Sequence, residues 1–218
     1  MVQPIELVIF DSDGVLVDSE IIANRVMAEA ATAAGAPMDL QEAMELFRGR
    51  KIAFCVAEIE RRSGRILGDG FIVEVRRATA LAFDQDLKAV EGVHEALDLI
   101  RQPYCVASNG PLEKLSHTLS LTDLYTRFEG RIFSAYEVGH WKPDPGLFLH
   151  ASQALGTDPA RCIVVEDSVT GVTAAKAAGM RVLGYAGEGP HAATALRNAG
   201  AEVFDHMRDL PRLLAQSV

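Results

Sequence analysis

Two carboxylates stand two residues apart in the segment IFDSDGVLVD, residues 9–18. Asp11 and Asp13 follow an apolar run at residues 5–10 that predicts a short buried strand, and Gly14 permits a turn after them. Two carboxylates this close repel each other unless a cation lies beside them. Either they serve a turn, in which Asp is common, or they hold a cation and do chemistry next to it.

Acidic and hydrogen-bonding residues also follow two later predicted strands, at residues 104–107 and 162–165. These residues are Ser108, Asn109 and Gly110 after the first strand, and Glu166 and Asp167 after the second. Ligands of parallel α/β sheets bind beyond the carboxyl ends of the strands, so we expect all of them near Asp11 and Asp13. Carboxylates and a backbone carbonyl are oxygen ligands, which suit Mg²⁺ and not zinc or copper.

The segment SNGP, residues 108–111, favours an anion site. Pro111 predicts the first residue of a helix, where the missing N–H costs nothing. The Ser108 hydroxyl and the N–H groups at that helix start would then face an anion favourably. An ordinary helix cap is the alternative interpretation.

A lysine lies in the segment WKPDP, residues 141–145. The prolines on both sides of Asp144 predict an extended turn that holds Lys142 rigidly. A fixed ammonium there could neutralise both a carboxylate nucleophile and a phosphate. A solvated surface lysine in a turn is the alternative.

The periodicity predicts an α/β protein with a doubly wound parallel sheet and a helical insertion. Strands and helices alternate from residue 104 onward, with further strands at 131–134, 181–185 and near 203. Residues 19–101 instead show helical patterns, broken at 35–37 and 68–70. We therefore expect a Rossmann-like core from residues 1–14 and 88–218, and a helical cap domain from residues 15–87.

Composition and charge limit the kinds of binding partner and the cellular compartment that we expect for this protein. The chain has 218 residues, 49% of them hydrophobic, and a formal net charge of −9. This charge gives no basis for binding nucleic acid, and no apolar run is long enough to span a membrane. Three scattered cysteines, Cys55, Cys105 and Cys162, predict buried free thiols, and no secretory signal is visible. We expect a cytoplasmic protein, either a monomer or a homodimer.

The ordered motifs DxDG, SNG, KPDP and EDSxxG at residues 11–14, 108–110, 142–145 and 166–171 resemble those of the haloacid dehalogenase-like hydrolase superfamily. The resemblance covers essentially the whole chain. The helical insertion resembles the cap of the phosphoglucomutase-like branch. The longer strings SNGP and WKPDP are most similar to bacterial sugar-phosphate phosphatases of the 6-phosphogluconate phosphatase kind.

The resemblance implies a role for each motif residue. Asp11 would be the nucleophile, and Asp13 the general acid and base that also offers its backbone carbonyl to Mg²⁺. Ser108 would bind phosphate, and Lys142 would balance the charge of the nucleophile and the phosphoryl group. Asp167 would bind the metal directly, with Glu166 behind it. Asn109 and Gly110 complete the phosphate-binding segment.

The predicted cap contains a cluster of cations, Arg48, Arg50 and Lys51, around Gly49. It could meet a second anionic group of a substrate, or it could be a solvated helix junction.

The leading hypothesis is a Mg²⁺-dependent phosphatase acting on a sugar phosphate or sugar-acid phosphate. A sugar phosphomutase of the same branch is the alternative. A dehalogenase is disfavoured because that branch lacks the second Asp, and a non-catalytic binding protein would be expected to have lost Asp11, Lys142 or Asp167.

Overall fold

The structure is a computed structural model that describes residues 4–48, 50–187 and 189–216. The chain divides into two compact units, Met1–Val17 with Ala89–Val218, and Asp18–Lys88. The first boundary lies three residues later than the sequence predicts. Residues 15–17 belong to the larger unit because all three side chains are fully buried and Val17 forms a β-bridge with Ala89.

The larger unit is built on one parallel sheet of six strands in the order β3-β2-β1-β4-β5-β6. The strands are β1 Leu7–Phe10, β2 Tyr104–Ser108, β3 Ile132–Ser134, β4 Cys162–Glu166, β5 Arg181–Tyr185 and β6 Glu202–Phe204. The chain runs outward from β1 through β2 to β3, then returns to β4 on the other side of β1. A doubly wound sheet opens a crevice at this switch point, beyond the carboxyl ends of the strands.

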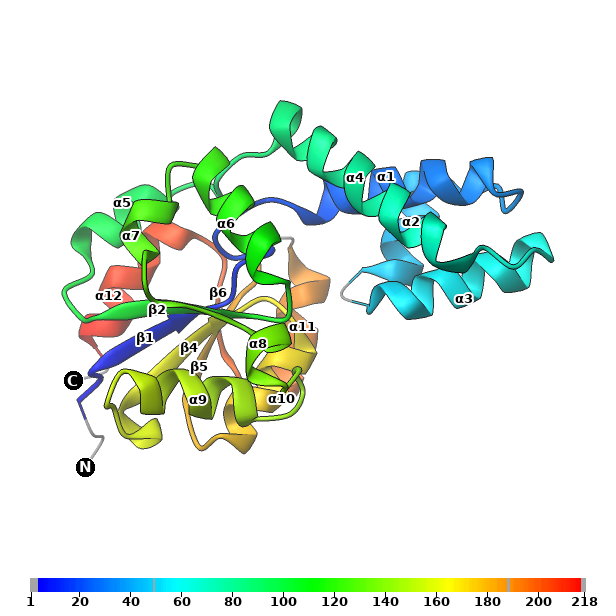
Figure 1. The fold of residues 1–218 in the computed structure, drawn as a ribbon. Coiled ribbons are helices and arrows are strands. Elements are labelled where there is room, and N and C mark those ends of the chain that lie inside the picture. Colours follow the sequence, from blue (N-terminus) through cyan, green and yellow to red (C-terminus); the bar gives the residue numbers. More distant parts are fainter. Residues whose placement is uncertain (1–3, 49, 188, 217–218) are drawn as a thin grey trace. The chain divides into compact units, whose positions relative to one another are not determined.

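Helices cover both faces of the sheet (Figure 1). The helices of this unit are α5 Val93–Leu99, α6 Leu112–Leu121, α7 Tyr125–Phe128, α8 Ala135–Val138, α9 Gly146–Ala154, α10 Val169–Ala177, α11 Pro190–Asn198 and α12 Leu210–Ala215, with 3₁₀ turns at Pro159–Arg161 and Met207–Asp209. The sequence analysis did not predict α7, α8 or α12. These helices have only four to six residues, too few to show a helical period.

The first strand is buried on both sides, as its continuous apolar run predicts. Leu7 and Ile9 pack into a core cluster with residues of α9, α10 and α11. Phe10 points to the opposite face, since side chains alternate along a strand. There its ring meets Phe128 of α7 edge-on, with centroids 6.1 Å apart. Burial on both faces holds the carboxyl end of β1, where Asp11 begins, in one position.

The inserted unit contains four helices, α1 Glu20–Ala33, α2 Leu40–Phe47, α3 Ile52–Ser63 and α4 Gly68–Asp86. All four helices contribute to one hydrophobic core that belongs to this unit. It includes Met27, Phe47, Ile59 and Val75. The predicted break in the helical pattern at residues 68–70 is too long. Gly68 takes a positive φ of 65° where α4 begins, and Gly70 already lies inside the helix.

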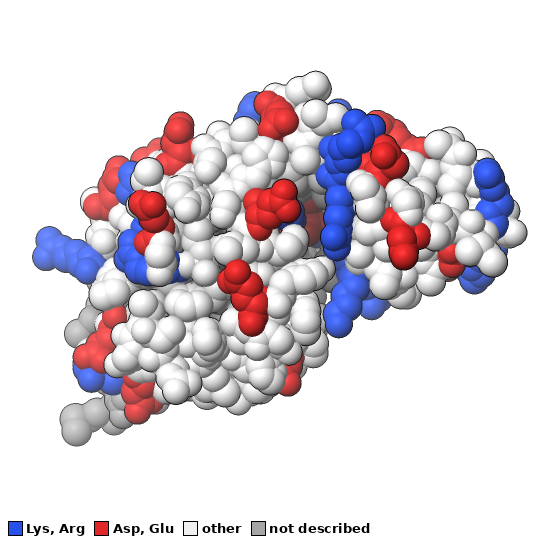
Figure 2. All heavy atoms as spheres, viewed as in Figure 1, with Lys and Arg blue, Asp and Glu red and all other residues white. Residues whose placement is uncertain are grey.

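The three cysteines are buried and form no disulfide, as predicted. Burial raises the pKa of the Cys55 thiol to about 11, so this cysteine is a poor nucleophile at neutral pH. Within the described residues, no helix has the length and apolar character that crossing a membrane requires. Acidic and basic side chains are both distributed over the surface seen in Figure 2.

One glycine allows α10 to begin close against the end of β4. A Cβ on Gly171 would lie 1.8 Å from Oε1 of Glu166, whose side chain is fully buried. We expect Gly171→Ala to displace Glu166 and lower the free energy of unfolding by about 1–3 kcal/mol, the cost of an overpacked core. Urea unfolding monitored by circular dichroism measures this difference.

Gly70→Ala is the matched control, because Gly70 is also helical and a Cβ there would have nothing within 4 Å. It should be neutral or slightly stabilising. Equal stability of the Gly171→Ala and wild-type proteins would show that the space beside Glu166 is not limiting.

Candidate active site

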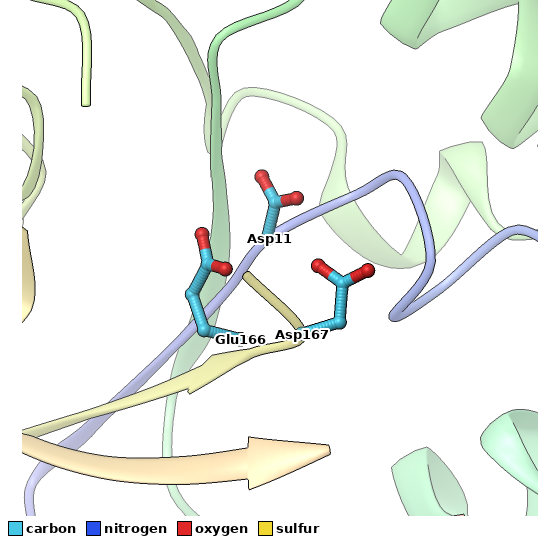
Figure 3. Close-up of side chains that lie close together, drawn as sticks. All are labelled: Asp11, Glu166 and Asp167. Carbon is cyan, nitrogen blue, oxygen red and sulfur yellow. The ribbon is translucent and has the colours of Figure 1, made fainter. Parts of the chain in front are cut away.

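The predicted site residues of the core come together at the carboxyl edge of the sheet. Asp11 directly follows β1, Ser108 is the last residue of β2, and Glu166 is the last residue of β4. Because β1 pairs with both β2 and β4, these three positions are neighbours although they lie far apart in the sequence. Figure 3 shows the carboxylates of Asp11, Glu166 and Asp167 gathered at the ends of β1 and β4.

A buried lysine joins two of these carboxylates. The Nζ of Lys142 donates to Oδ1 of Asp11 at 2.7 Å and to Oε1 of Glu166 at 2.6 Å. The side chain of Lys142 is only 3% exposed. The alternative of a solvated surface lysine is therefore wrong.

The loop that carries Lys142 is held by its own side chains and by β2. The Asn109 side chain accepts from the Lys142 backbone N–H at 2.9 Å and donates to the Lys142 carbonyl at 3.4 Å. Asp144 accepts from the backbone N–H of Gly146 at 2.7 Å, which confirms that it shapes the turn. Sequence analysis assigned Asn109 to the phosphate segment and missed this link to Lys142. A substrate contact of Asn109 stays a prediction.

Burial and neighbouring charges shift the pKa values of Asp11 and Lys142. Burial raises the pKa of Asp11 to about 7, and the nearby carboxylates of Glu166 and Asp13 add to the rise while Lys142 opposes it. Burial alone would lower the pKa of Lys142, but Asp11 and Glu166 together raise it above its usual value. The ammonium is therefore charged throughout the neutral range, whereas Asp11 gains its charge only near pH 7 unless a further cation is close.

The acidic cluster has the chemistry of a site for a hard cation. One carboxylate oxygen from each of Asp11, Glu166 and Asp167 lies within 4.8 Å of the others. Glu166 is already engaged, because its other oxygen accepts from the backbone N–H and the hydroxyl of Ser168 at 2.9 and 2.8 Å. Both oxygens of Glu166 therefore already have partners within the protein, since Lys142 contacts the first of them. Oxygen donors of this kind fit Mg²⁺.

Gly14 makes room for Asp167 in this cluster. It has a φ of 74°, and a Cβ there would lie 2.1 Å from Oδ2 of Asp167. A side chain at this position would be both strained and in collision with the carboxylate. The glycine of the DxDG motif is therefore required by the approach of the β4 end to the β1 loop.

The SNGP segment lies at the end of β2, as predicted, but the helix after it starts one residue later than predicted. Ser108 is 2% exposed, and its hydroxyl accepts from the backbone N–H of Gly110 at 3.2 Å. Pro111 is the residue before α6 and not its first residue, because its ψ of 148° is extended. The helix thus starts at Leu112, close behind Ser108, and binding of phosphate by Ser108 and Gly110 stays a prediction.

The structure also reveals a site residue that sequence reasoning missed. The Nζ of Lys114 lies 2.8 Å from Oδ1 and 2.7 Å from Oδ2 of Asp13. Asp13 is absent from the acidic cluster, and its predicted metal contact is through its backbone carbonyl, which stays a prediction. The sequence did contain a signal for Lys114. This lysine stands in the first turn of the helix after SNGP, where a cation does not interact favourably with the helix dipole.

The three cations predicted to contact substrate lie in the inserted unit. Nε of Arg48 is 4.0 Å from Oε2 of Glu20, and the Arg50 guanidinium lies 5.1 Å from the ring centroid of Phe54. Lys51 precedes α3. Gly49, which lies among these cations in the sequence, is outside the described residues. A contact of these cations with substrate stays a prediction.

Known proteins of the same family resemble this chain over most of its length. The haloacid dehalogenase-like hydrolase family matches residues 5–179. The chain is 35% identical to the 6-phosphogluconate phosphatase of Escherichia coli over 210 residues, which cover 96% of this chain and 94% of that protein. It is 31% identical to hexitol phosphatase B of Escherichia coli, over 79% of this chain and 80% of that one.

A solved structure agrees with the fold. The crystal structure of a haloacid dehalogenase-like protein from Agrobacterium tumefaciens superposes with a TM-score of 0.87 at 38% identity, covering 97% of this chain and 98% of that one. The family match spans the strands that carry Asp11, Ser108 and Glu166. This chain therefore belongs to the haloacid dehalogenase-like hydrolase family and is a phosphatase of that family.

Proposed function

We propose that this protein is a Mg²⁺-dependent phosphatase that hydrolyses a sugar phosphate or sugar-acid phosphate through a phosphorylated Asp11. The observation that carries the proposal is the buried contact of Lys142 with both Asp11 and Glu166, at 2.7 and 2.6 Å. A nucleophile that receives a phosphoryl group needs fixed positive charge beside it, because phosphoryl transfer depends mainly on positioning and charge neutralisation.

Asp11 is the nucleophile in this proposal. Its carboxylate attacks phosphorus, the bond to the sugar oxygen breaks, and an acyl phosphate forms on Asp11. Lys142 holds one oxygen of Asp11 and leaves the other to attack. The second step is attack of water on that acyl phosphate, which releases inorganic phosphate and restores the Asp11 carboxylate.

Asp13 moves the proton in both steps. Its carboxyl group gives a proton to the departing sugar oxygen and afterwards takes one from the attacking water. Asp13 is suited to this role because it lies two residues beyond the nucleophile and keeps 19% of its side chain exposed, so a leaving group and water can reach it.

A divalent cation bound here would neutralise charge on the transferred phosphoryl oxygens. Asp11 and Asp167 would hold it through their carboxylates, and Asp13 through its backbone carbonyl. Glu166 would stand behind them, because Lys142 and Ser168 already occupy its oxygens. The Ser108 hydroxyl and the Gly110 N–H would bind the phosphate from the β2 side.

The relatives support the substrate class. One is a 6-phosphogluconate phosphatase and another a hexitol phosphatase, so both act on phosphorylated sugars or sugar derivatives. We place selection among such substrates in the inserted helical unit, where Arg48, Arg50 and Lys51 could meet a second anionic group. Such a small-molecule role fits a cytoplasmic enzyme, whether monomer or homodimer.

The first experiment measures phosphate release from a panel of sugar phosphates and sugar-acid phosphates. We expect release with Mg²⁺, none after chelation, and a loss in kcat on the order of 10³-fold or more for Asp11→Asn, which removes the nucleophile's charge with little change of shape. A cooperative thermal unfolding transition of the variant well above the assay temperature serves as the folding control.

Two outcomes would count against the phosphatase. Retention of most of the wild-type rate by Asp11→Asn would rule out the covalent mechanism. Conversion of a sugar phosphate into its isomer without free phosphate would establish the phosphomutase instead.

Metal binding should depend on pH through Asp11. Because the pKa of Asp11 is raised to about 7 in the absence of a cation, a bound Mg²⁺ must displace a proton at lower pH. The apparent Mg²⁺ affinity should therefore fall as pH drops below 7, by up to about tenfold per pH unit for one proton. Isothermal titration calorimetry in buffers of different ionisation enthalpy counts the released protons.

Asp11→Asn is the control for this titration, since the variant should bind Mg²⁺ more weakly and with much less dependence on pH. An affinity of the wild-type protein that stays constant between pH 6 and 8 would show that Asp11 does not exchange a proton for the metal.

Lys142→Met should destabilise the protein as well as inactivate it. It leaves two buried carboxylates without their cation, and breaking a buried ion pair from one side costs about 3–5 kcal/mol. The loss should be larger at pH 8 than at pH 6, because Asp11, whose pKa is about 7, is largely protonated at the lower pH and then carries no charge to offset. Urea unfolding at the two pH values measures it.

Lys176→Met provides the matched comparison, because Lys176 is exposed on α10 of the same unit. It should unfold like the wild-type protein at both pH values. A Lys142→Met protein as stable as Lys176→Met would contradict the idea that this ammonium offsets the buried charge.

A further inference from the structure

A second lysine is paired with the second aspartate of the site. Lys114 of α6 donates to both carboxylate oxygens of Asp13, at 2.8 and 2.7 Å, although 101 positions separate the two residues. The two lysines differ in exposure: Lys114 keeps 32% of its side chain exposed, whereas Lys142 keeps 3%. The buried lysine contacts the proposed nucleophile Asp11, and the more accessible one contacts the proposed general acid Asp13.

The position of Lys114 is not explained by the stability of its helix. Lys114 is the third residue of α6, in the first turn. The positive end of the helix dipole lies there, so a cation is disfavoured and an anion would be preferred. A lysine at this position is better explained by its contact with Asp13.

Asp13 needs such a contact to keep its carboxylate in one direction. The carboxylate of Asp11 lies close enough to interact electrostatically with that of Asp13, and like charges repel each other. The bridge to Val17 holds the backbone of Asp13 in the turn that follows it. An ammonium that touches both oxygens fixes the plane of the carboxylate as well as its position.

We propose that Lys114 is a positioning residue that orients the Asp13 carboxylate toward the leaving-group oxygen. The proposal rests on the proposed function, in which Asp13 protonates that oxygen. An ammonium has three N–H donors on a flexible stem. Lys114 can therefore keep one oxygen of Asp13 while the other passes its proton to the sugar oxygen, as the bond between that oxygen and phosphorus breaks.

This role predicts a dependence on the leaving group. A sugar alkoxide is a poor leaving group and needs the proton from Asp13, whereas p-nitrophenolate leaves without it. Damage to the orientation of Asp13 should thus slow the hydrolysis of a sugar phosphate more than that of p-nitrophenyl phosphate. A general loss of folding or of phosphate binding would slow both alike.

The test compares kcat/KM of Lys114→Met and the wild-type protein on 6-phosphogluconate and on p-nitrophenyl phosphate, because kcat/KM covers the steps up to the departure of the leaving group and excludes the later hydrolysis of the acyl phosphate. We expect the ratio of the sugar-acid rate to the aryl rate to fall by about tenfold or more, part of the roughly 10²–10⁴-fold that a positioned acid supplies. Lys114→Arg, which keeps charge and donors, should restore part of the ratio. Lys176→Met, at an exposed position on α10, should leave the ratio unchanged.

A double-mutant cycle ties the effect to Asp13. In an Asp13→Asn background, Lys114→Met should not lower the ratio further, because the group that it orients is already gone. If Lys114→Met does not fold, Lys114→Gln keeps an N–H donor group without the charge and takes its place in the cycle.

The outcomes separate the positioning role from the proposed function. An equal loss on both substrates, or a full second loss in the Asp13→Asn background, would overturn the role of Lys114 while the phosphatase stands. A wild-type protein that releases phosphate from no sugar phosphate or sugar-acid phosphate of the panel, or an Asp11→Asn protein that hydrolyses both test substrates, would overturn the proposed function itself.

Discussion

The site depends on one buried ammonium between two carboxylates. Lys142 contacts Asp11 and Glu166 at 2.7 and 2.6 Å with almost no exposure to solvent. Without it, the carboxylates that follow β1 and end β4 would repel each other in a region of low polarity. With it, Asp11 has a fixed orientation, and the rise of its pKa that burial causes is partly offset.

Neighbouring residues hold Lys142 and Glu166 in the positions that their contact requires. Asn109 after β2 holds the backbone of Lys142, and Ser168 holds the second oxygen of Glu166. Gly171 and Gly14 leave space that a Cβ would fill, beside Glu166 and Asp167 respectively. Glycines and hydrogen bonds thus determine how far apart the charged side chains lie. The charged side chains in turn determine which reaction the site can support.

Much of the fold could be predicted from the sequence because its signals are local. The continuous apolar run of β1 and the alternation of strands and helices after residue 104 indicated the doubly wound sheet, and the helical patterns of residues 19–101 indicated the insertion. Short elements such as α7 and α8 could not be predicted, since four residues make no complete helical period. The boundary at residues 15–17 was misplaced because their burial depends on a bridge to Ala89.

The amino-acid sequence indicated that Asp11, Ser108, Glu166 and Asp167 reach the same edge of the sheet, because their motifs follow predicted strands and parallel strands end at one edge. It singled out Lys142 differently, through the prolines on both sides of Asp144. The folded chain then showed which groups contact each other: Asn109 binds the backbone of Lys142, and Lys114 pairs with Asp13. Contacts across 33 and 101 positions depend on the packing of separate elements, and no local pattern in the sequence encodes them.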